Sequence, residues 1–178
     1  VSCINYFNLD DENIEMTNTL ADKEYIFDTY ITENPDDQYG LDGIAFDKEG
    51  NLYVGNFGDG AIFKVELNED GSMKRKELFA KDPENLRSTD GMCFDDKGNL
   101  YVADFVVNAI AKVYPDGRVE RIAQSPDSDG FNGELDQPGE PCFWNGNLVV
   151  SCFDTVVGGD KVNTKHEQPA TMAMIRLS

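Results

Sequence analysis

GNLYV occurs at residues 50–54 and again at 98–102, and the related GNLVV follows at 146–150. Successive copies start 98 − 50 = 48 and 146 − 98 = 48 residues apart. A fixed period of this size indicates a chain of repeated structural units. The period therefore predicts the fold class before any residue propensity is considered.

The sequence around each pentapeptide repeats as well. LDGIAFDKEGNLYVGNF (41–57) aligns with TDGMCFDDKGNLYVADF (89–105), and more loosely with GEPCFWNGNLVVSCF (139–153). Each copy reads as two short β-strands joined by a tight polar turn, with glycine or asparagine where a hairpin needs positive φ. No stretch shows a sustained 3.6-residue apolar period, so we expect few helices.

Further β-rich runs complete each unit. A third strand is predicted in every unit and a fourth only in the first two; these runs lie at 61–67, 109–114 and 171–177, and at 74–79 and 118–123. Four antiparallel strands in ~40–50 residues is typical of a β-propeller blade. The sequence predicts an all-β fold, a β-propeller of four-stranded antiparallel blades, of which this chain supplies about three.

One domain is predicted over residues 1–178. Residues 1–36 are expected to end a preceding blade, with its third strand at 3–9 and its outer strand at either 14–19 or 25–31. The following ranges are predicted as two whole blades and a last blade without its outer strand: 37–84, 85–132 and 133–178. Propellers close at ~4–8 blades, so we expect an N-terminal half or a second copy to complete the ring. The alternative is a compact open sheet structure of three units.

Composition limits the partners and the location. Lys and Arg number 15 and Asp and Glu 34, so the net charge is −19, which argues against nucleic acid and anionic membranes as partners. No run approaches ~18 apolar residues, the length expected of a membrane span. The cysteines form no CxxC pair, which slightly favours the cytoplasm. Cys93 and Cys142 occupy equivalent positions in neighbouring units and are predicted to be buried apolar fillers.

Blade topology predicts which face of the disc carries function. The start of the first strand, the loop between strands two and three and the connection to the next blade share one face. Asp42, Asp90 and the loops 56–60 and 104–108 are expected there, together with the irregular stretches 125–141 and 154–170. Long stretches without strand pattern are uncommon unless functional or disordered.

Two aspartates are the main candidates for a metal site. Asp42 and Asp90 each precede a glycine at the start of an inner strand, where neighbouring blades approach the central axis. Carboxylates that converge on one axis supply hard oxygen ligands, which suit Ca²⁺ or another divalent cation. The alternative is an Asp-Gly turn that only caps the strand. The third unit departs from the pattern, with Gly139 at the aspartate position and Glu140 beside it.

Other residues carry weaker signals. Asn56 and Asp104 are equivalent residues after strand two that could line a pocket or close a turn. DSDG (127–130) lacks the later ligands of an EF-hand and reads as an acidic linker. His166, the only histidine, lies in the 154–170 loop and reads as exposed rather than catalytic. No GxSxG motif supports a serine nucleophile.

STDGMCFDDKGNLYVADF (88–105), followed by AIAKVYPDGRV (109–119), resembles the six-bladed propeller family of gluconolactonase, senescence marker protein and luciferin-regenerating enzyme. NLVVSCFDTVVGGD (147–160), with MAMIRL (172–177), is similar to the last blade of the drug-responsive lactonases in that group. The similarity covers about residues 40–178. The DGMCFD segment is its most specific part, because GNLYV also occurs in noncatalytic propellers.

The resemblance implies a calcium-dependent hydrolase of lactones or related esters. It places Asp90 as calcium ligand and as general base or nucleophile, and Asp42 where the family has an asparagine ligand. The family's other ligands, a glutamate from the first blade and a residue from the third, are expected outside this chain. Asn56, Asp104 and Glu140 are candidate substrate-binding residues, with 154–170 as a lid. The alternative is a noncatalytic NHL-type propeller that binds a ligand or protein on the same face.

Overall fold

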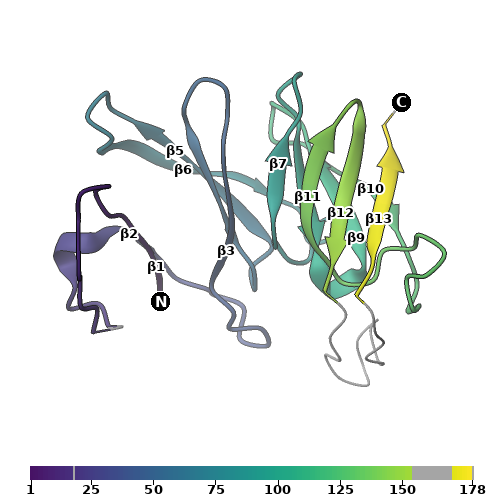
Figure 1. The fold of residues 1–178 in the computed structure, drawn as a ribbon, viewed down its shortest axis with the longest axis horizontal. Helices are drawn as coiled ribbons and strands as arrows, with labels where there is room; N and C mark the ends of the chain where they lie inside the picture. The colour runs from purple at the N-terminus through teal and green to yellow at the C-terminus, as the bar shows by residue number, and fades with distance from the viewer. Residues whose placement is uncertain (18, 154–169, 178) are drawn as a thin grey trace.

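The repeat units form three antiparallel sheets in this computed structural model, which describes residues 1–17, 19–153 and 170–177 (Figure 1). The first sheet contains β3 (Leu41–Phe46), β4 (Leu52–Asn56), β5 (Ala61–Leu67) and β6 (Met73–Lys81). The second contains β7 (Met92–Phe94), β8 (Leu100–Asp104), β9 (Ala109–Val113) and β10 (Val119–Gln124). The third contains β11 (Pro138–Trp144), β12 (Asn147–Cys152) and β13 (Met172–Arg176). Within the described residues, the third sheet has the expected three strands.

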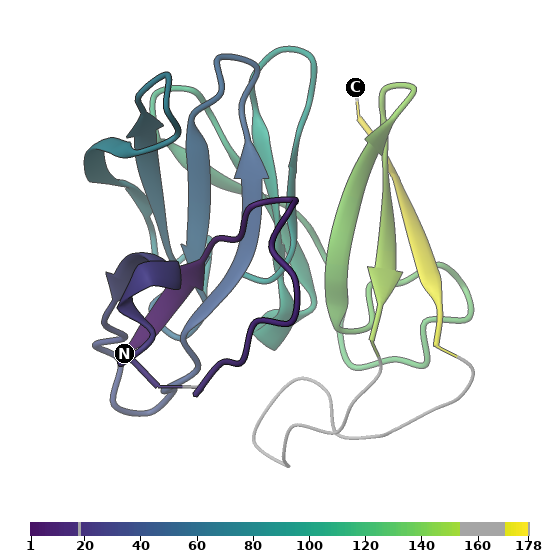
Figure 2. The ribbon, with the colours of Figure 1, turned by 60° about the vertical axis from the view of Figure 1, so that its left-hand side comes forward.

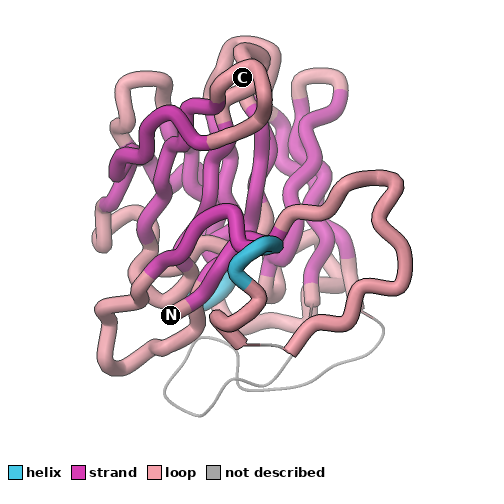
Figure 3. Tube along the Cα trace, turned by 90° about the vertical axis from the view of Figure 1, so that its left-hand side faces the viewer, coloured by secondary structure: helices cyan, strands magenta, loops and turns pink. Residues whose placement is uncertain are grey.

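A strand pair precedes the three sheets. β1 (Ser2–Asn5) pairs with β2 (Ile26–Tyr30), so the second of the two alternative positions for the outer strand is the one that forms. β1 is shorter than predicted because the chain turns after it, where the Asp11 carboxylate accepts a hydrogen bond from Asn8 N at 2.8 Å. Strands dominate the described chain, whose helices are two short 3₁₀ turns, η1 (Lys23–Tyr25) and η2 (Phe105–Val107) (Figure 3).

The 48-residue period reflects a repeated hydrogen-bonded turn. At the second turn, Asp95 Oδ1 accepts from the N–H groups of Lys97 and Asn99 at 2.9 and 2.8 Å, and Oδ2 accepts from Asn99 Nδ2 at 2.7 Å. Tyr101 Oη adds a bond of 3.1 Å, and Gly98 has a φ of 83°. The first turn makes the same three bonds to its own aspartate. The repeated Asp, Gly and Asn are therefore the parts of one turn.

The third turn is shorter by one residue. Asn145 and Gly146 both have positive φ, 49° and 73°, as a two-residue type I′ hairpin requires. Asn147 Nδ2 donates back to Asn145 O at 2.9 Å. This deletion explains why the third copy aligns more loosely with the other two.

The sheets pack face to face, and the core lies between them (Figures 1 and 2). The cluster between the first two sheets includes Tyr53, whose ring meets Phe79 and Phe94 edge-on at centroid distances of 5.1 and 4.9 Å. A second cluster between the second and third sheets includes Ile110 and Leu148, both fully buried. Each buried large apolar side chain contributes roughly 1.5–3 kcal/mol. The junctions between sheets thus supply most of the apolar stabilisation.

The burial predicted for Cys142 is wrong, whereas Cys93 is half-buried. Cys93 and Cys142 lie on the same face of their own sheets, the face turned toward the next sheet along the chain. For Cys93 the next sheet is the third, so Cys93 packs against the cluster between the second and third sheets. Cys142 is in register with Val149, which is in register with Met174, so these three share the outer face of the third sheet. No described strand covers that face, and the Cys142 thiol is exposed.

The irregular stretch predicted at 125–141 ends earlier than expected. β11 begins at Pro138, and the segment before it is tied down by Leu135 N, which donates to Ser125 Oγ at 2.9 Å. The other stretch, 154–170, and with it His166, lies outside the described residues except for Ala170. Within the described ranges, no helix is long and apolar enough to cross a membrane.

Removing the Asp95 carboxylate should destabilise the second sheet. We expect Asp95→Ala to lower the free energy of unfolding by about 1–3 kcal/mol, because four donors lose their acceptor. Asp96→Ala, at the exposed neighbour in the same turn, is the matched control and should change stability by less than about 0.5 kcal/mol. Urea unfolding of the two variants checks this, and equal losses would contradict the role given to the turn.

Candidate carboxylate site at the inner strands

The starts of the inner strands are pressed together through glycines. β7 contacts both β3 and β11. A Cβ atom at Gly43 would lie 2.1 Å from the Asp90 carbonyl oxygen, and one at Gly91 would lie 2.6 Å from the Gly139 carbonyl oxygen. Such approaches exclude every residue with a side chain. The Asp-Gly pairs therefore allow three inner strands to meet at one end.

Asp90 is held in place by the neighbouring strands. Its N–H donates to Ala103 O at 2.9 Å, and Gly91 N donates to Gly139 O at 2.8 Å. The carboxylate accepts a hydrogen bond at Oδ1 from Gly91 N at 2.9 Å, as Asp42 Oδ1 does from Gly43 N at the same distance. The second oxygen of each aspartate accepts no hydrogen bond from the described residues. The predicted capping contact is present, and one carboxylate oxygen stays available.

Glu140 joins the two aspartates from the third sheet. A Cβ atom at Gly91 would lie 2.0 Å from Glu140 Oε2, so this carboxylate rests against the glycine that follows Asp90. Sequence analysis named Glu140 only as a substrate-binding candidate and missed this contact. The available signal was the absence of a side chain at Gly91, which leaves room for a group from the next sheet.

The three carboxylates are close enough for their negative charges to affect the pKa of Asp90 and of Glu140. Burial, the Asp42 charge and, more weakly, the Glu140 charge raise the pKa of Asp90 to about 6, against the lowering effect of the Gly91 N–H. Burial and then Asp42 raise the pKa of Glu140. Among the described residues, no lysine or arginine forms an ion pair with any of the three. The cluster is therefore acidic without internal compensation.

The cluster fits a divalent cation in charge and in ligand type, since Ca²⁺ prefers oxygen ligands. Within the part of the chain that the structure describes, however, no three Asp, Glu, His or Cys side chains come together as a set that could hold a metal. Any metal would need further ligands. The metal-binding roles of Asp42 and Asp90 stay predictions.

Asn56 is fully buried and braces a loop. Its Nδ2 donates to Ile31 O at 3.0 Å, and its Oδ1 accepts from Thr32 Oγ1 at 3.0 Å. These bonds tie the end of β4 to the segment that follows β2. The contacts match the turn-closing alternative and give no support to substrate binding.

Asp104 plays the equivalent part in the second sheet. It is also fully buried, and its carboxylate accepts from Arg87 N at 2.8 Å and from Ser88 N and Oγ at 2.9 Å each. Arg121 lies 3.8 Å away. Asp104 thus holds the segment that leads to Asp90, although burial raises its pKa. Its position suits support of the site rather than contact with a ligand.

Comparison with known proteins agrees with this architecture. The sequence model of the SMP-30/Gluconolactonase/LRE-like region matches residues 23–130, more than half of the chain. The chain belongs to this family. No curated protein matches the sequence. The family match and the structure of a luciferin-regenerating enzyme described next confirm the predicted fold class of a β-propeller built from antiparallel blades.

Solved structures of other proteins resemble this chain at low sequence identity. A luciferin-regenerating enzyme is 18% identical with a TM-score of 0.55, covering 71% of this chain and 39% of its own. A calcium-binding regucalcin from Agrobacterium tumefaciens is 20% identical with a TM-score of 0.49, covering 63% and 37%. A virginiamycin B lyase from Staphylococcus aureus is 13% identical with a TM-score of 0.48, covering 83% and 44%. The chain thus spans less than half the length of these proteins.

The raised pKa predicts that Asp90 destabilises the fold at neutral pH. A folded-state pKa of about 6 against an ordinary value of 3.8 means that protonation stabilises the fold at low pH, an effect lost as the pH rises through 6. We expect Asp90→Asn to gain about 1–2 kcal/mol at pH 8, after allowance for solvent screening, and nothing at pH 3.5. Urea unfolding at both pH values, with Asp96→Asn as control, measures this. A gain independent of pH would contradict it.

Proposed function

We propose that this chain carries part of the active site of a calcium-dependent hydrolase that opens lactones or related esters. The observation that supports this is the half-buried Asp90 carboxylate, which is held rigidly at the meeting point of three inner strands. One of its oxygens is available, and its pKa is raised to about 6. A carboxylate of this kind is ionised at neutral pH and a stronger base than an ordinary aspartate.

In this proposal, Asp90 acts on the substrate carbonyl carbon. Its available oxygen either takes a proton from a water molecule that attacks the carbonyl or attacks the carbonyl itself. On the first route, the ring C–O bond of the lactone then breaks and the leaving oxygen takes the proton that Asp90 received from the water. On the second route, the C–O bond breaks to leave an acyl-aspartate anhydride, and water hydrolyses it to free Asp90 and supplies the proton for the leaving oxygen. The Gly91 N–H group orients the carboxylate by occupying its other oxygen. Glu140 lies beside the reacting group and would contact the rest of the substrate.

Asp42 and Asp90 would hold the cation together with ligands outside the described residues. When bound, Ca²⁺ would polarise the substrate carbonyl as a Lewis acid. Two lines support this: the uncompensated negative charge of the cluster, and the family to which the chain belongs. Asp42 brings more negative charge than the asparagine implied by the family resemblance, which favours a cation of higher charge density.

A noncatalytic propeller that binds a ligand or protein on the same face is the second candidate function. Two observations favour it: Gly139 occupies the aspartate position of the third unit, and the described residues form no complete metal-ligand set. Calcium titration separates the two functions. A hydrolase of the proposed type should gain thermal stability with micromolar to millimolar Ca²⁺ and lose it with chelator, whereas a plain scaffold should not respond.

Activity tests the catalytic role directly in the complete protein that contains this chain. We expect Asp90→Asn to reduce lactone hydrolysis by a factor of at least about 10³, because the amide is neither base nor nucleophile. Proton release from glucono-1,5-lactone and from an aromatic lactone measures turnover, and Asp96→Asn should keep wild-type rates. Circular dichroism confirms that the variant is folded. Retained turnover in a folded Asp90→Asn protein would overturn the proposed function.

A further inference from the structure

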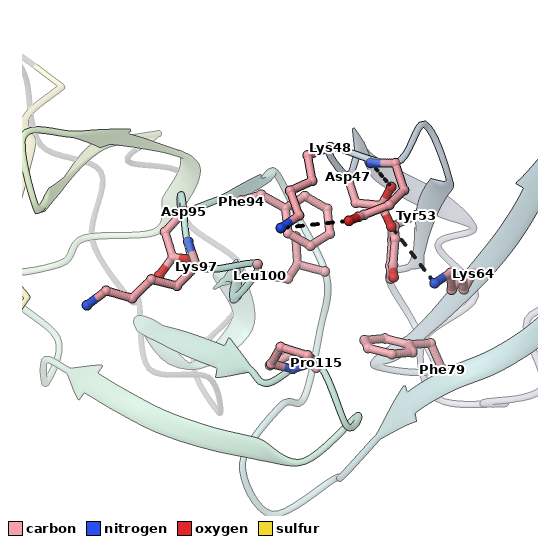
Figure 4. Close-up of a pocket in the computed structure, with 13 residues that line it drawn as sticks. Asp47, Lys48, Tyr53, Lys64, Phe79, Phe94, Asp95, Lys97, Leu100 and Pro115 are labelled. Carbon is pink, nitrogen blue, oxygen red and sulfur yellow. Dashed lines mark hydrogen bonds and ion pairs between the residues drawn. The ribbon is translucent and has the colours of Figure 1, made fainter.

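A hollow of about 240 Å³ lies between the first two sheets, at the turn end of their inner strands (Figure 4). Its apolar lining includes Tyr53, Phe79, Phe94 and Leu100. The tyrosine ring is braced edge-on by both phenylalanines, at centroid distances of 5.1 and 4.9 Å. Leu100 is fully buried in the core beneath. The hollow therefore has a preformed aromatic floor.

This hollow is separate from the carboxylate site. β3 runs from Asp42 toward the turn that begins at Asp47, and β7 runs from Asp90 toward the turn at Asp95. The hollow is lined by the two turns, whereas the carboxylates stand at the starts of the strands. The two features occupy opposite ends of the same inner strands.

The rim carries Lys48 and Lys64 from the first sheet and Lys97 from the second (Figure 4). Lys64 Nζ lies 5.4 Å from the Tyr53 ring centroid and 3.9 Å from Asp47 Oδ2. Among the residues that the structure describes, Lys48 forms an ion pair with its sequence neighbour Glu49 alone, at 3.7 Å, and the two side chains are 74% and 60% exposed. An ion pair this exposed contributes little. The Lys48 amine can therefore exchange Glu49 for another carboxylate at small cost.

We propose that the hollow binds a small organic anion, a monocarboxylate with a planar ring or short apolar body. The apolar body lies against Phe79 and Phe94, the aromatic lining residues that are partly exposed, and the carboxylate meets the amines of Lys48 and Lys64. Ligand sites typically combine a mostly apolar lining with a few polar groups that orient the ligand. The Asp47 carboxylate competes weakly, because it already accepts three hydrogen bonds within its own turn.

The second turn carries the same charges as the first in a different order. One period of 48 residues after Lys48 stands Asp96, and one period after Glu49 stands Lys97, so the acid and the lysine are exchanged. Lys64 has the equivalent Lys112, whose amine lies 4.5 Å from the Tyr114 ring centroid. The second unit thus keeps both lysines, with the lysine of the turn moved by one position. The substitution Lys48→Asp therefore gives the first turn the residue type that Asp96 has at the equivalent position of the second turn.

Titration with benzoate, and with benzamide as its neutral analogue, tests the proposal on the same complete protein that is used for the activity test. We expect benzoate to shift the backbone amide resonances of the turns 47–50 and 95–98 in a saturable way, and benzamide to bind at least roughly fivefold more weakly. Lys48→Asp should weaken benzoate binding roughly fivefold or more, because one attraction becomes a repulsion. Glu49→Gln should strengthen it, because the competing carboxylate is gone.

Controls separate this site from the proposed catalytic one. Lys112→Gln removes a matched lysine outside the hollow and should leave benzoate affinity unchanged, as should Asp90→Asn at the other end of the strands. The proposal is overturned if benzoate produces no saturable shifts, if benzamide binds equally well, or if Lys48→Asp has no effect. A change of affinity in either direction in Asp90→Asn would place the bound anion at the carboxylate end and also contradict the proposal.

Discussion

The burial of each sheet by its neighbour is the interaction on which the rest of this structure depends. A four-stranded antiparallel sheet leaves two apolar faces, and here the clusters between consecutive sheets hold the large apolar side chains. The carboxylate site follows from this stacking, because Asp42, Asp90 and Glu140 come from three different sheets. Loss of one junction would separate the groups as well as weaken the fold.

The stacking also brings like charges together. Gly43 and Gly91 let the inner strands approach until backbone meets backbone. Burial, and then the charges of the neighbouring carboxylates, raise the pKa of Asp90 and Glu140. Nothing in the described residues compensates this charge by an ion pair. A fold that only needed stability would favour neutral side chains here, so the cluster is better explained by a ligand of positive charge or by proton transfer.

The sequence period predicted the strands and the turns well, because equivalent residues do equivalent work in each unit. Asp47 and Asp95 close the same turn, and β4, β8 and β12 all carry the repeated pentapeptide. The period could not predict that no described strand covers the outer face of the third sheet. For this reason the burial predicted for Cys142 was wrong. Nor could the period show that Asn56 and Asp104 form hydrogen bonds with the segments that precede their sheets. It also could not show that the Glu140 carboxylate lies against Gly91, because this contact joins two different units.

Asp90 and Asp95 are five positions apart in the chain, and the structure gives one a role in the candidate site and the other a role in stabilising the fold. Asp95 accepts hydrogen bonds from its turn, which lower its pKa despite partial burial, so it stabilises the fold above its ordinary pKa and loses this effect as the pH falls. Burial and two acidic neighbours raise the pKa of Asp90 against a single such bond, so its effect on stability has the opposite sign. The residue type is the same, and burial, neighbouring charge and the number of hydrogen-bond donors decide the role. An acid whose oxygens are all occupied holds the fold, whereas one left with a free oxygen among like charges is available for chemistry.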